Sequence, residues 1–232
     1  MLIFKMLYFL DIPNILLVIL ALSLGLYGFV KNPKSRLVQV WFALNMAVTA
    51  WAVGYILTNY SVSNSQAFIC LKIVYFAASL IPILFFHFVS SFLFKNYKYR
   101  ILIYIGYISA LFFLILNVLT NHIISGIRFM ENYGSYEEIE TKGFYFFLIY
   151  FFFFSFFSIG LLWKGYKESS GVRKRQIFYI ALAALVGFLG GTSNFFTDLT
   201  GIYPYGQFVV WLYPLFITYG MYIDEIQIKI KF

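Results

Sequence analysis

The residue with the clearest chemical potential is Lys72, a lone cation inside a long apolar run. It lies about six residues, or about 9 Å along a helix, from the outer start of that run. A lysine at the centre of a membrane helix costs about 2.5–3.5 kcal/mol on insertion scales. Two interpretations follow. Lys72 either snorkels to the outer interface, or it binds Asp198 or an anionic ligand in an outer cavity.

Polar and aromatic side chains near the expected depth of Lys72 extend this predicted outer pocket. They are Trp51, Tyr55, Asn117, Asn194, Asp198, Tyr203, Tyr205, Gln207 and Trp211. One interpretation is an aromatic belt with polar helix ends, which is common at membrane interfaces. The other is an aromatic-lined pocket, open to the outside, that binds a ligand. Periodicity does not separate the two.

Other chemistry is not indicated by the sequence. It contains no Gly-rich phosphate loop, HExxH, CxxC pair or GxSxG motif. His87 and His122 belong to different segments and do not form a metal set. The last apolar run lacks the lysine that retinal binding requires, which excludes a rhodopsin. We therefore expect no cofactor and no enzymatic activity in this chain.

Membrane helices are the elements that must position these residues. The chain has 232 residues, of which 62% are hydrophobic and 11% charged, whereas soluble domains average about 45–50% and about 25%. This composition excludes a disordered chain, and the single cysteine, Cys70, excludes a disulfide scaffold. The net charge of +8 arises from short basic clusters between apolar runs. We therefore expect the lipid bilayer, and no nucleic acid, as a partner.

Seven apolar segments are long enough to cross about 30 Å of hydrocarbon as helices. They are Ile12–Val30, Leu37–Thr58, Ala67–Phe94, Ile101–Leu119, Phe144–Leu162, Gln176–Phe196 and Gly206–Ile223. The sequence thus predicts an all-α polytopic membrane protein, with a single seven-helix bundle over residues 1–232. The extracellular loop Thr120–Gly143 is long enough for a hairpin of Ile123–Phe129 and Tyr136–Thr141, with its turn near Asn132 to Gly134.

The basic residues are unevenly divided between the two sets of connections. Thirteen of the 17 Lys and Arg residues lie on one side, while Lys5, Arg128 and Lys142 lie on the other. Because cytoplasmic loops carry the excess of Lys and Arg, this predicts an N-terminus outside and a C-terminus in the cytoplasm. The expected location is the cell membrane.

Three patterns concern packing. Ala183, Gly187 and Gly191 recur at four-residue spacing, which is typical of helices that approach closely, and internal packing is favoured over a dimer face. Asn45, in the middle of its segment, predicts a hydrogen bond between helices. Pro214 interrupts the last segment and predicts a kink there.

Three stretches together carry a family resemblance. They are Trp41–Leu57, Ile81–Phe94 and Lys174–Ile228, and the third contains a Gly-Gly…Asn pattern, Tyr-Pro-Tyr-Gly and an aromatic last segment. The chain resembles the seven-helix N-terminal sensor region of prokaryotic histidine kinases. The resemblance implies a sensory module for signal transduction in a two-component system. The expected protein partner is a cytoplasmic kinase or another signalling protein. The sequence leaves the oligomeric state open, with a homodimer as the second use of the small residues Ala183, Gly187 and Gly191.

The resemblance also contains a departure. Family members usually continue into a cytoplasmic output domain, whereas this chain ends at Phe232 and has no histidine after His122. We expect a stand-alone receptor or the sensor part of a longer chain. The alternative function is a small-solute transporter or channel, although missing internal repeats and mid-membrane carboxylates disfavour it. A membrane enzyme ranks third.

Overall fold

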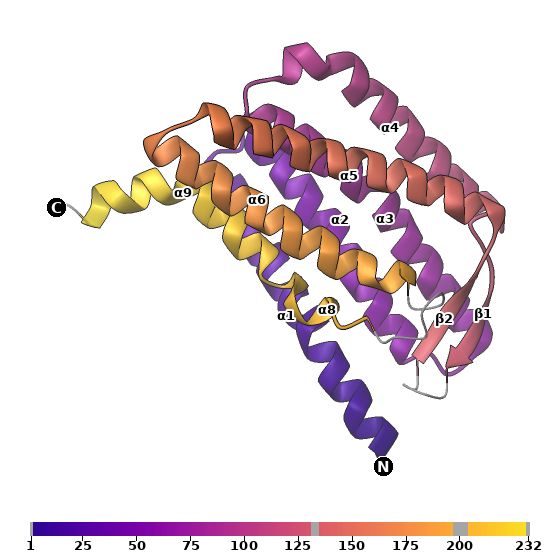
Figure 1. Cartoon of the computed structure of the whole chain (residues 1–232). Helices are drawn as coiled ribbons and strands as arrows, with labels where there is room; N and C mark the ends of the chain where they lie inside the picture. Colours follow the sequence, from indigo (N-terminus) through magenta and orange to yellow (C-terminus); the bar gives the residue numbers. More distant parts are fainter. Residues whose placement is uncertain (1, 131–134, 197–203, 231–232) are drawn as a thin grey trace.

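Long helices make up most of the chain (Figure 1). The computed structural model describes residues 2–130, 135–196 and 204–230, with side chains for 11–130, 136–195 and 204–224. The long helices are α1 (Leu2–Lys31), α2 (Arg36–Asn59), α3 (Asn64–Phe92), α4 (Asn96–Leu119), α5 (Lys142–Glu168), α6 (Gly171–Thr192) and α9 (Tyr213–Ile230). The short elements are the 3-10 turn η1 (Ser193–Phe196), helix α8 (Gln207–Val210) and strands β1 (Ile124–Met130) and β2 (Ser135–Glu140).

Six helices within the described ranges are long and apolar enough to cross a membrane by length and composition. They correspond to the first six predicted segments, which confirms a helical, multi-pass membrane protein. Local chemistry explains several helix starts. The Ser63 hydroxyl accepts a hydrogen bond from the Gln66 amide at the start of α3, and Thr141 accepts one from the Gly143 amide at the start of α5. Such caps satisfy backbone donors that have no partner within the helix.

The segment predicted as Gly206–Ile223 is divided between α8 and α9. Helix α8 ends at Val210 and α9 begins at Tyr213. Pro214 falls in the first turn of α9, where its missing N–H leaves no helical hydrogen bond unmade. The interruption predicted near Pro214 is therefore present, but it separates two helices instead of kinking one.

The core lies between α2, α3 and α5. Helix α2 packs along α3, and the side chains of Trp41, Tyr75 and Phe86 are fully buried there. Phe86 of α3 meets Phe154 and Phe157 of α5, with ring centroids 5.4 and 5.5 Å apart. Such aromatic pairs add about 0.5–1.5 kcal/mol each beyond their buried area. Helix α4 lies at the edge of the bundle (Figure 1), and most of its apolar side chains face outward.

The predicted hairpin is confirmed. Strand β1 pairs antiparallel with β2, with Phe129 opposite Tyr136; the predicted turn at Asn132 to Gly134 lies outside the described residues. The strands pack against α2 and α3 at the end of the bundle away from the C-terminus (Figure 1). We call this the hairpin end. The opposite end is the basic end, formed by the α1–α2, α3–α4 and α5–α6 connections and the end of α9.

Glu138 of β2 connects the hairpin to the bundle. It is only 2% exposed. Its carboxylate accepts a hydrogen bond from the hydroxyl of Tyr75, which is fully buried in α3. A carboxylate that is buried and hydrogen-bonded in this way aligns β2 on α3.

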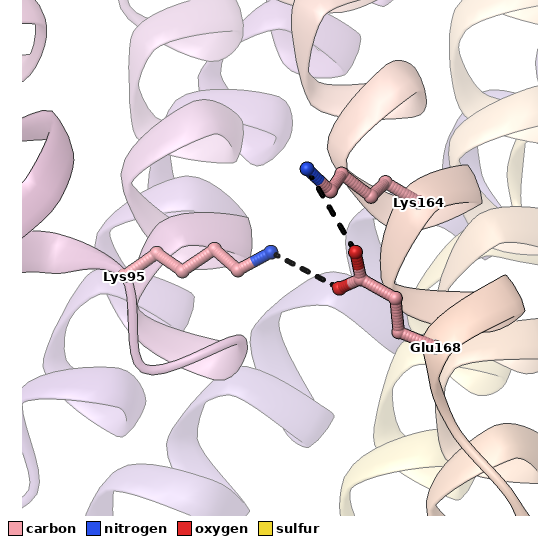
Figure 2. A network of polar contacts seen from close by, with 3 residues as sticks. All are labelled: Lys95, Lys164 and Glu168. Carbon is pink, nitrogen blue, oxygen red and sulfur yellow. Dashed lines mark ion pairs between the residues drawn. The ribbon is translucent and has the colours of Figure 1, made fainter.

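An ion pair joins the α3–α4 connection to the end of α5 at the basic end. Figure 2 shows Glu168, at the end of α5, between Lys95 and Lys164. The N···O distances are 4.0 Å to Lys95 and 3.7 Å to Lys164. Exposed pairs of this kind contribute only about 0–1 kcal/mol each. The Lys95–Glu168 pair therefore ties the α3–α4 connection to α5 weakly, and the Lys164–Glu168 pair lies within α5.

Candidate ligand-binding cavity

A partly open apolar cavity of about 60 Å³ lies among α2, α3, α5, α6, α8 and α9. Its wall includes Trp51 of α2, Phe85 of α3, Phe151 of α5, Val210 of α8 and Tyr213 of α9. Because these side chains are mostly hydrocarbon and aromatic rings, the cavity suits an apolar molecule. It offers few groups for a charged one.

Small residues on α6 create the space. Ala183, Ala184, Gly187 and Gly191 all line the cavity. The sequence predicted close helix contact along Ala183, Gly187 and Gly191, and the structure corrects this at Gly191. A methyl group added there would meet nothing within 4 Å, while one at Gly187 would lie 3.5 Å from the Tyr213 side chain. The stripe therefore opens room beside α9.

A hydrogen bond links α2 to α9 beside this cavity. The Tyr213 hydroxyl donates to Asn45 Oδ1 at 3.2 Å, and the Asn45 amide donates to the Trp41 carbonyl at 2.9 Å. The interhelical hydrogen bond predicted for Asn45 is thus confirmed. Since Asn45 is fully buried, this link is a specific contact between α9 and the core.

Part of the predicted outer pocket lies next to the apolar cavity. Trp51 lines the cavity, and its ring packs edge-on against Tyr55 with centroids 4.9 Å apart. Asn194 and Gln207, both buried, are joined because the Gln207 amide donates to Asn194 Oδ1. Asn194 follows the lining residue Gly191, and Gln207 precedes the lining residue Val210, each by about one helical turn.

Two other residues of the predicted outer pocket, Trp211 and Tyr205, do not line the apolar cavity. Trp211 uses its indole N–H on the Phe208 carbonyl at 2.9 Å, and Tyr205 is 66% exposed. Asp198 and Tyr203 lie outside the described residues. The apolar cavity thus includes Trp51 and lies beside the Asn194–Gln207 pair, while Tyr205 is largely exposed.

Lys72 and Asn117 form a separate contact between α3 and α4. The Lys72 ammonium donates to the Thr120 carbonyl at 2.9 Å, and the Asn117 amide donates to the Lys72 carbonyl at 2.8 Å. Thr120 is the C-cap of α4, where a cation satisfies a terminal carbonyl and the negative end of the helix dipole. This capping contact was not among the sequence-based interpretations of Lys72.

Two buried acidic residues were missed as structural features. Neither Glu138 nor Asp11 was singled out from the sequence, yet Asp11 is 1% exposed and accepts a hydrogen bond from the Asn59 amide at 2.8 Å. Within the described ranges, no three His, Cys, Asp or Glu residues are grouped to hold a metal ion.

The architecture and the cavity define a class, and sequence comparison defines the family. Six apolar helices around an aromatic core make this a multi-pass helical membrane protein. The family model described as the N-terminal 7TM region of histidine kinase matches residues 14–224. The chain therefore belongs to that family and contains a histidine kinase 7TM sensor region, as the resemblance implied. No curated protein matches the chain.

Proposed function

We propose that this chain is a membrane receptor that binds a small apolar ligand in the apolar cavity and transmits the event through α9. The observation that carries the proposal is the composition of the cavity wall. Core helices α2, α3 and α5 form one part, and α6, α8 and α9 form the other. A ligand at this position contacts both parts, and α9 leads to the C-terminus.

The size of the cavity supports a coupled movement. An engineered apolar cavity of about 150 Å³ binds benzene, whereas this one measures about 60 Å³. A ligand of that size must therefore extend through the open part of the cavity or widen the space. A ligand that binds the wider state more tightly shifts the population towards it. Such a shift would strain the Tyr213–Asn45 hydrogen bond between α2 and α9.

Within this proposal, α8 and α9 together make the seventh membrane crossing and α9 carries the output. The receptor lies in the cell membrane with its hairpin end outside and its basic end in the cytoplasm, in accordance with the distribution of Lys and Arg. Catalysis belongs to a kinase domain, on the same polypeptide or on a signalling partner. A homodimer is compatible with this arrangement.

The orientation predicts opposite labelling of two engineered cysteines. Ser125 on β1 and Lys167 on α5 are both exposed, at the hairpin and basic ends respectively. In a Cys70→Ala background, we expect a membrane-impermeant maleimide to label Ser125→Cys in intact cells. It should label Lys167→Cys only after the membrane is opened. Labelling of Lys167→Cys in intact cells would reverse the proposed orientation.

Filling the apolar cavity should remove the response to an apolar probe. Ala184 is 2% exposed and lines the cavity, so Ala184→Val places two further methyl groups in it. Cavity filling commonly adds about 0.5–2 kcal/mol of stability. We expect the variant to have a higher melting temperature in detergent. In a fusion that carries a histidine kinase output module after Phe232, we also expect the variant to lose any benzene-induced change in autophosphorylation.

The matched control is Leu185→Val, at the next position. Leu185 is 43% exposed on the outside of the bundle, so this variant should keep the benzene response. An equal response in Ala184→Val and Leu185→Val would assign the effect to the bilayer. That result, or no benzene response in the parent chain, would rule out the cavity as the input site.

A further inference from the structure

An open apolar groove runs between α4 and α5. It has a volume of about 620 Å³. Helix α4 contributes lining residues from Leu102 to Leu116, and α5 contributes lining residues from Gly143 to Phe154. Both helices run between the two ends of the bundle (Figure 1), and both are long and apolar enough to cross a membrane. We call this feature the α4–α5 groove.

The α4–α5 groove has a buried floor and exposed walls. The floor consists of three aromatic side chains that are 3–7% exposed, Phe113, Tyr150 and Phe154. The walls include five apolar side chains that are 48–67% exposed, namely Ile105, Phe112, Phe146, Ile149 and Phe153. The Tyr150 hydroxyl donates to the Ser79 carbonyl of α3 at 2.9 Å, so it is used inside the bundle. The groove therefore presents hydrocarbon and aromatic rings to the surrounding membrane.

Contacts to α3 fix the position of α4 beside the groove. The Tyr107 hydroxyl and His87 Nδ1 are 2.9 Å apart, and the Asn117 amide donates to a backbone carbonyl of α3 at 2.8 Å. At Gly106 the two helices approach so closely that an added methyl group would collide with Ile83 of α3. Helix α4 therefore could not close the groove by moving onto α5 without breaking its contacts with α3.

The groove lies nearer the hairpin end of the bundle than the basic end. On α5 it extends from Gly143, the second residue of the helix, to Phe154, whereas the helix continues to Glu168. On α4 the distance from Leu102 to Leu116 corresponds to about 21 Å of helix. One leaflet provides about 15 Å of hydrocarbon, half of a bilayer core of about 30 Å. The groove is therefore long enough for the acyl chain of a lipid whose headgroup lies at the hairpin end.

The volume of the groove distinguishes an acyl chain from a helix as its occupant. A helix about 21 Å long and about 10 Å in diameter occupies about 1,600 Å³, which is more than twice the 620 Å³ of the groove. A methylene group takes up roughly the volume of a water molecule, about 30 Å³, so the groove holds about 20 such groups. This capacity matches one acyl chain, whereas a helix would rest on the walls without filling the space between them.

We propose that the α4–α5 groove binds one acyl chain of a phospholipid from the leaflet at the hairpin end. The chain would contact α4 and α5 together and pack against the rings of the floor through dispersion. Residues beside the mouth at Gly143 carry both signs of charge, Glu140 and Lys142, so recognition rests on the chain and not on the headgroup. The groove and the apolar cavity share no lining residue, so failure of one proposal leaves the other intact.

The test titrates the purified full chain, in uncharged detergent, with three lipids. They are palmitoyl-oleoyl phosphatidylcholine, the phosphatidylglycerol with the same chains, and dihexanoyl phosphatidylcholine. Native mass spectrometry measures bound lipid and oligomeric state in the same sample. We expect the two long-chain lipids to have dissociation constants within about twofold of each other. The short-chain lipid should bind at least about tenfold more weakly, because its chains reach only part of the groove and lose most of the dispersion contacts.

Ser109→Phe places a ring in the middle of the groove, since Ser109 lines it halfway between Leu102 and Leu116. Phe is more favourable than Ser in a membrane span, so the variant should fold with an unchanged or higher melting temperature without lipid. We expect about tenfold weaker binding of both long-chain lipids, which corresponds to about 1.4 kcal/mol. Ser109→Leu, a smaller change at the same position, should weaken binding in the same direction.

The matched control is Ile108→Phe, at the next position on α4. Ile108 is 68% exposed and does not line the groove, so this variant should bind lipid as the parent chain does. It adds an aromatic ring to the same helix at nearly the same depth. Weaker binding in both Ser109 variants, with parental binding in Ile108→Phe, would support the groove as the site.

Three outcomes would overturn the proposal. Parental lipid binding in both Ser109 variants would show that the lipid binds elsewhere on the protein. A dimer that Ser109→Phe dissociates without loss of lipid would assign the groove to a second copy of the chain. A preference of about tenfold or more for phosphatidylglycerol over phosphatidylcholine would place recognition in the headgroup instead of the chain.

Discussion

Tyr75→Phe should destabilise the bundle by about 2–3 kcal/mol, because it removes the hydroxyl that hydrogen-bonds a buried carboxylate. Tyr75 is fully buried and Glu138 is 2% exposed, so water does not readily replace the lost donor. For a domain of this size, about 1 kcal/mol corresponds to about 2–4 °C. We therefore expect the melting temperature in detergent to fall by about 4–12 °C.

Two further variants test the cause of that loss. Tyr145 lies near the start of α5, and its ring is 51% exposed. Tyr145→Phe removes the hydroxyl from this exposed ring and should change stability by less than about 0.5 kcal/mol. Tyr75→Phe combined with Glu138→Leu removes both partners, which is usually milder than removing one. A double variant as unstable as the sum of both single variants would show that Tyr75 and Glu138 do not act as a pair.

The helices and the hairpin could be predicted because each depends on a local pattern. The length of an apolar run sets a membrane helix, and alternation along Ile123–Phe129 and Tyr136–Thr141 predicted two strands. Asn45 was correctly predicted to bridge helices, because a buried amide in the middle of a membrane span needs a partner from another helix. The division between α8 and α9 was harder to predict from the sequence, because Pro214 is compatible both with a kink and with a helix start.

The candidate site was harder to predict, because depth in a membrane does not fix direction around a helix. Lys72 and Asn194 were expected at one level, but Lys72 caps α4 at Thr120 while Asn194 meets Gln207. The apolar cavity was not predicted either. It depends on the mismatch between small residues on α6 and the side chains opposite them, and the same small residues also predict close packing.

Gly190 and Gly191 show how sharply neighbouring small residues differ. A methyl group on Gly190 would lie 2.6 Å from the Gly206 carbonyl oxygen and 2.5 Å from Val210 Cγ2. The backbones of α6 and the residue before α8 are therefore in contact at this point. A methyl group on Gly191 would meet nothing within 4 Å.

These contacts predict opposite effects of one methyl group at adjacent positions. Gly190→Ala should destabilise the protein by about 3 kcal/mol, the upper end for overpacking, because a backbone carbonyl has less freedom to move aside than a side chain. Gly191→Ala should stabilise it by about 0.5–1 kcal/mol, since alanine is the better helix former. Melting temperatures of both variants in detergent measure the difference, and shifts of the same sign would contradict the close approach of Gly190 and Gly206. Because Val210 also lines the apolar cavity, displacement of α8 by Gly190→Ala should also alter the cavity, whereas Gly191→Ala should leave α8 in place.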